Sequence, residues 1–339
     1  MNIRMQRILA GLIVMALFLG LAGCSQAPAP TPAPAPTPKI EQVTIAASQG
    51  SGSYPLAPLM ENNALKDIAD KTVIEPWVTS EQLSAMVTSD QAQFAVGPIT
   101  NFLMLYNKGA NVKLVNVSVW GMLYILSADD SVKSIADLKG KTIAVTGGLT
   151  SYHGNLLRYI LMKNNLDPEK DLTIVNMDMT EASAQMATGG IKLALSNEPN
   201  STITIENAKK GNINVIRAID LQKEWARAVG DENARIPQAG LIVVGDNAQN
   251  HALVTVVRDQ YLESAKWINQ NPAQAGPLVE KYFPKMKAAA VEKSMPYAGL
   301  NPVASSECKE EINAFLTEYL KVAPPASIGG KMPDDGFYY

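Results

Sequence analysis

From Lys39 onward, short β-branched runs alternate with stretches of helical periodicity, and this alternation limits the folds that the chain can adopt. Strands separated by helices favour an α/β fold with mainly parallel sheets, because each helix carries the chain back to the same edge of a sheet. The predicted strands cover residues 43–48, 72–78, 94–98, 112–127, 141–148, 172–178, 191–199, 213–220 and 237–246, and residues 112–127 are interrupted near Gly121.

Helical periodicity fills most of the intervals between these strands. The predicted helices cover residues 55–68, 79–89, 101–108, 151–164, 181–188 and 201–210, and four more follow at 251–269, 272–282, 285–293 and 306–322. Ser80 is the expected N-cap of the helix at 79–89. The elements form two similar α/β halves, and a segment of about 300 residues is long enough for two lobes with separate cores.

The residues before Lys39 have a different character. Arg4 and Arg7 precede an uncharged apolar run at residues 8–20, which has the length of a signal-peptide core. The tetrapeptide Leu21-Ala22-Gly23-Cys24 matches the bacterial lipoprotein signal, which implies that residues 1–23 are removed and Cys24 is lipidated. The alternative is an ordinary secretory signal with an incidental cysteine.

Residues 24–39 would then form a lipidated cysteine and a stalk rich in proline and alanine. Proline fixes φ and lacks a backbone N–H, so this stalk should be an extended polyproline II spacer of roughly 35–40 Å. We therefore expect an extracytoplasmic protein that is anchored to the cell membrane through a lipid.

Charge and cysteine content argue against several other classes. The formal net charge of −3 gives no indication of a nucleic-acid surface. Cys308 is the only other cysteine, and its helical context predicts a packing role rather than a disulfide. The two histidines, His153 and His251, lie far apart without cysteines or carboxylates at ligand spacing, so neither a metal site nor a cofactor is expected.

Ligands of open α/β sheets bind outside the carboxyl ends of the strands, in the loops that lead into helices. Four loops here meet that criterion, and residues near other strand ends complete a candidate site. The candidate ligand-binding residues are Ser48, Gln49, Gly50, Ser51, Ser53, Tyr54, Trp77, Pro98, Thr100, Trp120, Gly148, Thr150, Ser151, Tyr152, His153, Asn197, Glu198 and Gln238.

Several of these residues have two possible roles. Glu198 could accept hydrogen bonds from an amine or amidine of a ligand, or it could cap the helix that follows it. Trp77 and Trp120 could stack on a planar ligand or belong to the core. Gly50 and Gly52 resemble half of a dinucleotide fingerprint, but Pro55 stands in place of the third glycine, so NAD is not expected.

The four loops contain no arginine or lysine. Arg158 and Arg235 lie nearby in the sequence, and a solvated position is the favoured interpretation of both. The absence of a dedicated positive charge favours an aromatic or heterocyclic nitrogenous solute over an anion.

The most specific motif is Asp137-Leu138-Lys139-Gly140-Lys141, which follows an extended segment at 122–127 and precedes a hydrophobic strand. It resembles the start of the second lobe in type II periplasmic solute-binding proteins. Asn197-Glu198-Pro199 resembles the Glu-Pro turn of the subgroup that binds alkanesulfonates, nitrate, taurine and thiamine precursors. Lys192 departs from this pattern, since the family usually carries aspartate at that place.

This resemblance implies a two-lobed fold with a ligand cleft. Lobe 1 would comprise residues 40–122 and 243–339, lobe 2 residues 127–238, and the extended segments at 122–127 and 237–244 would be the hinge crossovers. The protein would be a monomer that captures a small organic solute, such as a thiamine-precursor-like pyrimidine, and delivers it to ABC permease subunits. The alternatives are a binder of sulfonate- or nitrate-type anions, an enzyme on the same fold such as a pyrimidine synthase or lyase, and a receptor subunit.

Overall fold

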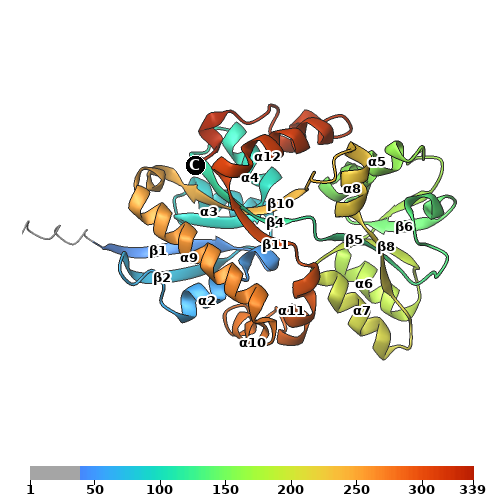
Figure 1. Cartoon of the computed structure of the whole chain (residues 1–339), viewed down its shortest axis with the longest axis horizontal. Coiled ribbons are helices and arrows are strands. Elements are labelled where there is room, and N and C mark those ends of the chain that lie inside the picture. Colours follow the sequence, from blue (N-terminus) through green and yellow to red (C-terminus); the bar gives the residue numbers. More distant parts are fainter. Residues whose placement is uncertain (1–38) are drawn as a thin grey trace, which may run out of the picture. The chain divides into compact units, whose positions relative to one another are not determined.

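Two β-sheets, each covered by helices, organise residues 39–339, which are the residues that this computed structural model describes (Figure 1). The signal peptide, the lipidation of Cys24 and the stalk predicted above lie outside the described residues. No helix between Lys39 and Tyr339 combines the length and the apolar character that a membrane crossing requires.

The first sheet has six strands in the order β11-β4-β10-β3-β1-β2. Strand β1 pairs in parallel with β2 and β3, whereas β10 is antiparallel to β3 and β4, and β11 is antiparallel to β4. The sheet is therefore mixed, and the expectation of mainly parallel pairing was wrong for these strands. Its strands are β1 (Ile40–Ala47), β2 (Ala69–Pro76), β3 (Phe94–Pro98), β4 (Val112–Trp120), β10 (Pro237–Val244) and β11 (Leu300–Ala304).

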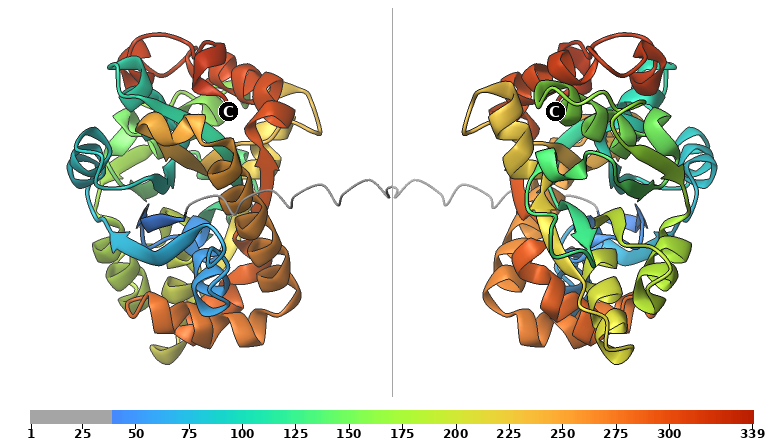
Figure 2. Two further views of the ribbon diagram at one scale, coloured as in Figure 1. Left: turned by 90° about the vertical axis from the view of Figure 1, so that its left-hand side faces the viewer. Right: turned by 90° about the vertical axis from the view of Figure 1, so that its right-hand side faces the viewer.

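Helices cover both faces of this sheet (Figure 2). Alternate residues of β1 point to opposite faces, so that Val43 and Ile45 pack with the core under α9, while Ala46 packs with the core under α4. We call this sheet and its helices lobe 1. The helices are α2 (Leu56–Glu61), α3 (Ser80–Thr88), α4 (Ile99–Asn107), α9 (His251–Gln270), α10 (Pro272–Tyr282), α11 (Ala288–Ser294) and α12 (Ser305–Tyr319).

The second sheet has five strands in the order β7-β6-β8-β5-β9, and it forms lobe 2 with four helices on the right of Figure 1. Strand β6 is parallel to β7 and β8, and β5 is antiparallel to β8 and β9. The elements are β5 (Leu123–Ser127), β6 (Thr142–Val145), α5 (Tyr152–Lys163), β7 (Thr173–Asn176), α6 (Met179–Thr188), β8 (Leu193–Asn197), α7 (Asn200–Lys210), β9 (Ile216–Asp220) and α8 (Leu221–Val229).

The two connections between the sheets run side by side. The chain leaves lobe 1 at Gly121 and Met122, which both have positive φ, and the Gly121 N–H donates to the Ile236 carbonyl at 2.9 Å. A Cβ atom at Gly121 would lie 2.9 Å from the Cβ atom of Gln222, so this close approach requires glycine. Strand β5 pairs within lobe 2 and β10 pairs within lobe 1 along their lengths, so the two connections lie just before Leu123 and just before Pro237. Neither 122–127 nor 237–244 forms a hinge crossover as predicted.

Local structure differs from the sequence expectations at a few other places. The helix predicted at 55–68 ends at Glu61, because Asn63 adopts a left-handed conformation with φ of 44°. Thr79, not Ser80, caps α3 through a reciprocal capping box with Gln82. Helix α8 and strand β11 were not predicted.

Candidate functional site

A cavity of about 330 Å³ lies between the lobes, at the carboxyl ends of strands from both sheets. Lobe 1 contributes the loop after β1, the junction of β3 with α4, and the start of β10. Lobe 2 contributes the first residues of α5 and the loop between β8 and α7, and Met122 of the first connection completes the wall. The lining residues are Ser48, Gln49, Gly50, Ser51, Gly52, Trp77, Val96, Gly97, Pro98, Thr100, Asn101, Met122, Tyr152, His153, Asn197, Glu198, Pro199, Asn200, Gln238 and Ala239.

The structure thus brings together most of the candidate residues that the strand-end rule selected. The candidates that line the cavity are Ser48, Gln49, Gly50, Ser51, Trp77, Pro98, Thr100, Tyr152, His153, Asn197, Glu198 and Gln238. Trp77 is only 7% exposed, and its indole N–H donates to the Val96 carbonyl at 3.2 Å. Gly97 allows the Trp77 ring to pack against it, since a Cβ atom there would come within 2.9 Å of the ring.

Six candidates do not line the cavity, and those with clear contacts have structural roles. Tyr54 and Ser53 are fully buried, and the Tyr54 hydroxyl pairs with the Ser294 hydroxyl at 3.2 Å. Trp120 donates its indole N–H to the Asn301 carbonyl. Ser151 caps α5 by accepting a hydrogen bond from the Gly154 N–H. Gly148 and Thr150 form the turn that leads into α5.

Glu198 caps a helix and pairs with an arginine. Its Oε2 atom accepts hydrogen bonds from the Thr202 N–H at 3.2 Å and the Thr202 hydroxyl at 2.8 Å, which places the carboxylate at the positive end of α7. Its Oε1 atom accepts a hydrogen bond from Arg217 Nε at 2.7 Å. The side chain is fully buried, so both oxygens are already committed and the capping alternative holds.

Arg217 is the important residue that sequence reasoning missed. It lies on β9, an edge strand of the five-stranded sheet, and none of the four loops contains it. Its Nη2 atom also donates to the Thr202 hydroxyl at 2.6 Å. A buried glutamate after a strand requires a positive partner, and that requirement was the only available signal.

The cavity lining carries no uncompensated charge. Arg217 neutralises Glu198, and the lining includes no lysine or arginine. Desolvation lowers the pKa of His153 to about 4, so the imidazole is neutral at pH 7. Arg158 pairs with Glu169, and Arg235 pairs with Glu311, so neither arginine faces this cavity.

Two polar atoms in the lining are buried and have no hydrogen-bond partner among residues 39–339. They are the Tyr152 hydroxyl, at the start of α5 in lobe 2, and Gln238 Oε1, on β10 in lobe 1. Burial also raises the pKa of the Tyr152 hydroxyl well above its usual range, so this group can both donate and accept a hydrogen bond. Each lobe thus contributes to the lining one residue with a buried polar atom that has no partner among the described residues.

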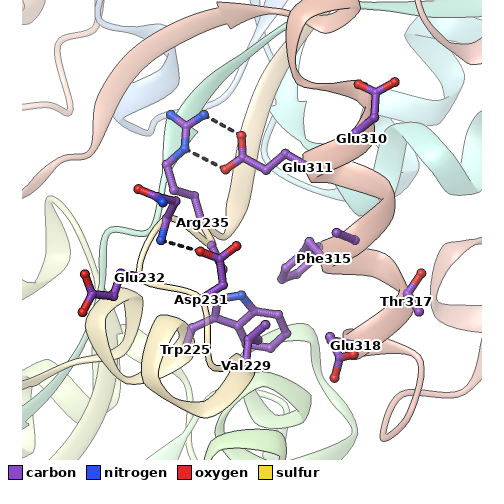
Figure 3. Close-up of a pocket in the computed structure, with 13 residues that line it drawn as sticks. Trp225, Val229, Asp231, Glu232, Arg235, Glu310, Glu311, Phe315, Thr317 and Glu318 are labelled. Atoms are coloured by element: carbon purple, nitrogen blue, oxygen red, sulfur yellow. Dashed lines mark hydrogen bonds and ion pairs between the residues drawn. The ribbon is translucent and has the colours of Figure 1, made fainter.

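A larger groove of about 910 Å³ lies next to the return connection, between α8 with its following loop and α12 (Figure 3), and we refer to its position as behind the connections. Arg235 forms paired hydrogen bonds with Glu311 there, at 2.7 and 2.6 Å. The lining residues are Trp225, Val229, Asp231, Glu232, Asn233, Ala234, Arg235, Glu310, Glu311, Ala314, Phe315, Thr317 and Glu318.

We favour the smaller cavity as the functional site, although the groove is larger. The groove does not lie at the carboxyl ends of the strands, and none of its lining atoms is a buried polar atom without a partner. In the described part of the chain, no cluster of three or more His, Cys, Asp or Glu side chains could hold a metal ion.

Comparisons with known proteins support the fold. A family model described as NMT1/THI5 like matches residues 71–275. An ABC transporter protein from Parabacteroides distasonis aligns with a TM-score of 0.72 and 20% identity, over 88% of this chain and 98% of that one. No curated protein sequence matches this chain.

Two further solved structures share the fold at lower identity. The periplasmic aliphatic sulphonate binding protein from Escherichia coli has a TM-score of 0.63 and 17% identity, over 85% of this chain and 94% of that one. The periplasmic nitrate-binding protein from Synechocystis PCC 6803 has a TM-score of 0.58 and 13% identity, over 86% of this chain and 85% of that one. The two-lobed α/β fold predicted from the sequence is confirmed.

Proposed function

This chain belongs to the NMT1/THI5-like family, and we propose on that premise that it is a solute-binding protein of an ABC importer. It captures a small organic solute between its lobes and presents it to permease subunits. The names of its structural neighbours support this role, since they include an ABC transporter protein, a sulphonate binding protein and a nitrate-binding protein.

The observation that carries the proposal is an interlobe cavity whose lining includes, from each lobe, one residue with a buried polar atom that has no partner among the described residues. The Tyr152 hydroxyl comes from lobe 2 and Gln238 Oε1 comes from lobe 1. A solute that hydrogen-bonds to both would bind the closed arrangement more tightly than an open one. Such a difference in affinity is what a ligand needs to shift an open–closed equilibrium.

We propose an uncharged, planar nitrogenous heterocycle as the solute, with a pyrimidine related to thiamine precursors as the leading example. Three aromatic residues line the cavity, namely Trp77, Tyr152 and neutral His153, and aromatic rings are suited to a planar solute. Gln238 Oε1 can accept a hydrogen bond only from an N–H or O–H donor. A volume of about 330 Å³ lies at the small end of the usual range for ligand sites.

An anionic solute, such as a sulfonate or nitrate, has less support. Anions often bind at helix N-termini, but the Glu198 carboxylate occupies the N-terminus of α7 and the Ser151 hydroxyl caps α5. The N-terminus of α4, at Pro98, has no side-chain cap and is the one that an anion could use. No lysine or arginine lines the cavity to add a full positive charge to it.

We further propose an extracytoplasmic monomer that is attached to the membrane through lipidated Cys24 and the proline-rich stalk, on the strength of the sequence pattern before Lys39. The proposal is one of binding without catalysis. Conversion of a bound compound into a product would identify an enzyme on this fold instead.

A thermal-shift screen of the full chain tests the proposed function. The library should contain neutral pyrimidines, purines and flavins, with sulfonates and nitrate as the anionic arm. A compound at about 100 times its dissociation constant stabilises by about 2.7 kcal/mol, which raises the unfolding midpoint by a few degrees in a protein of this size. Neutral heterocycles should produce that shift, and stabilisation by anions alone would overturn the proposed solute class.

A further inference from the structure

We infer that Arg217 and Tyr297 form a latch beside the cleft that holds the two lobes together, and that Arg217 is thereby a positioning residue for the solute site. This inference rests on the proposed function, because closing matters only to a protein that encloses a solute. The latch joins β9 of lobe 2 to the short turn Met295–Tyr297 of lobe 1, which follows α11.

The contact between the two residues is a cation–π interaction. The Arg217 guanidinium carbon lies 3.8 Å from the centroid of the Tyr297 ring and 5.6 Å from that of Tyr124, also in lobe 2. The Tyr124 hydroxyl donates a hydrogen bond to the Tyr297 carbonyl at 3.1 Å. The guanidinium is therefore held between a ring of its own lobe and a ring of the opposite lobe.

On the lobe 2 side, the latch is connected directly to the cavity wall. Arg217 binds Glu198 and Thr202 through its Nε and Nη2 atoms. Glu198 lines the cavity, and so do its neighbours Asn197 and Asn200. Displacement of this loop would move the guanidinium away from Tyr297.

On the lobe 1 side, the turn that carries Tyr297 also touches the cavity loop after β1. The Ser51 hydroxyl, which lines the cavity, donates to the Ala298 carbonyl at 3.5 Å. The Tyr54 hydroxyl pairs with the Ser294 hydroxyl at 3.2 Å. Solute-facing loops of both lobes thus meet at residues 294–298, which makes this segment a mechanical link between them.

The contact is exposed enough to open and close. Tyr297 is 41% exposed and the Arg217 side chain is 16% exposed. A cation–π contact at such a site should change the ratio of open to closed protein by about fivefold. Removing the ring should therefore open the cleft without unfolding either lobe.

Acrylamide quenching of tryptophan fluorescence tests the latch in the full chain without added solute. Trp77 lines the cavity and is 7% exposed, so opening of the lobes gives acrylamide access to it. A Trp267→Phe background removes the tryptophan that is already 37% exposed. In this background, Tyr297→Leu should raise the quenching constant by up to about fivefold, whereas Tyr297→Phe, which retains the ring, should match the parent.

Each alternative result contradicts the latch. Unchanged quenching in Tyr297→Leu would show that the ring does not hold the lobes, and increased quenching in both variants would show that the ring face is not the contact. An increase that persists after Trp77→Phe would indicate general loosening rather than cleft opening. Because acrylamide is the probe, failure of this test leaves the solute-binding proposal standing, and failure of the solute screen leaves the latch standing.

Discussion

An arginine, a glutamate and an aromatic ring meet at two places in this molecule, with similar chemistry and different access to water. Beside the cleft, Arg217 pairs with Glu198 and stacks on Tyr297 at 3.8 Å. Behind the connections, Arg235 pairs with Glu311 and stacks on Trp120 at 3.7 Å. The Glu198 side chain is fully buried, whereas that of Glu311 is 25% exposed. The same ion pair should therefore contribute differently to stability at the two sites.

The surroundings of the two arginines differ as well. Behind the connections, the lobes share apolar packing, since Trp225 of α8 lies 5.0 Å from Phe315 of α12 between ring centroids. At the latch, the contacts between lobes are the Arg217 guanidinium on the ring of the exposed Tyr297 and the hydrogen bond from the Tyr124 hydroxyl to the Tyr297 carbonyl. Separation of Arg217 from Tyr297 exposes little apolar surface, because Tyr297 is already 41% exposed, so this contact is the one expected to open.

Replacement of the buried carboxylate should have the largest effect. Glu198→Gln leaves the Arg217 charge without its partner in a largely buried position, and we expect a loss of about 3 kcal/mol in the free energy of unfolding. Urea unfolding followed by circular dichroism measures this loss. A loss below about 1 kcal/mol would show that the buried Glu198–Arg217 pair contributes no more to stability than the partly exposed Glu311–Arg235 pair.

Acid should lower the free energy of unfolding through protonation of His153, which lines the cavity. Its pKa in the folded protein is about 4 and its unfolded value is about 6.5, so only the unfolded chain takes up this proton between those pH values. The free energy of unfolding should thus fall as the pH drops from 6.5 to 4, with a contribution of about 2 kcal/mol from this residue. Between pH 7 and 4.5, the free energy of unfolding of His153→Gln should therefore fall by about 2 kcal/mol less than that of wild type.

The second histidine provides the control for the acid experiment. His251 is exposed at the start of α9, away from the cavity lining. His251→Gln should leave the His153 contribution to the acid dependence in place, because His251 does not line the cavity. Equal losses in wild type and His153→Gln would show that His153 is not desolvated in the folded protein.

Two tyrosines of α5 should respond to loss of their hydroxyls with opposite signs. Tyr152 carries a buried hydroxyl without a partner, so Tyr152→Phe should raise the free energy of unfolding by about 1 kcal/mol while weakening solute binding. The Tyr159 hydroxyl donates a hydrogen bond to Glu318 of α12, so Tyr159→Phe should lower the free energy of unfolding by about 1 kcal/mol. Differential scanning calorimetry of both variants measures these changes. Changes in the free energy of unfolding with the same sign in both variants would contradict this assignment.

The smallest effect is expected behind the connections. Glu311→Gln removes a carboxylate that water can replace in part, and the exposure of both partners limits the loss to about 0.5–1 kcal/mol. Urea unfolding under the conditions used for Glu198→Gln gives the direct comparison. A loss equal to that of Glu198→Gln would show that burial does not separate the two pairs.

The sequence indicated well those features that depend on local chemistry. The Asp137-to-Lys141 motif could be recognised because Asp137 accepts hydrogen bonds from the N–H groups of Lys133 and Ser134, and Gly140 adopts a φ of 74°. The candidate loops were found because strand ends determine where loops gather. Helix α8 carried usable signals that were overlooked, namely Asp220 as its N-cap and Gly230 as its left-handed C-cap.

Features that depend on tertiary contacts could not be read in this way. Glu198 and Arg217 are 19 residues apart and lie on different elements, so their pairing follows from the fold of lobe 2. Tyr54 follows a candidate loop, but its burial against Ser294 depends on a segment far along the chain. Strand β11 contains Pro302 and pairs only with β4 at the sheet edge, where sequence signals for strands are weak.

The central claim is that the cavity between the lobes, and not the larger groove behind the connections, holds the solute. Gly50 has an extended φ of −145° and room for a Cβ atom, with Ser48 Oγ at 3.8 Å, so Gly50→Leu should fill the cavity without strain. Ala314 is an exposed residue of α12 that lines the groove, and Ala314→Leu is the matched change there.

The most direct measurement is the thermal shift of both variants with the compound that stabilises wild type most strongly in the screen. Our account predicts that Gly50→Leu abolishes the shift and that Ala314→Leu retains it. A shift that survives in Gly50→Leu and disappears in Ala314→Leu would place the solute in the groove and contradict the account.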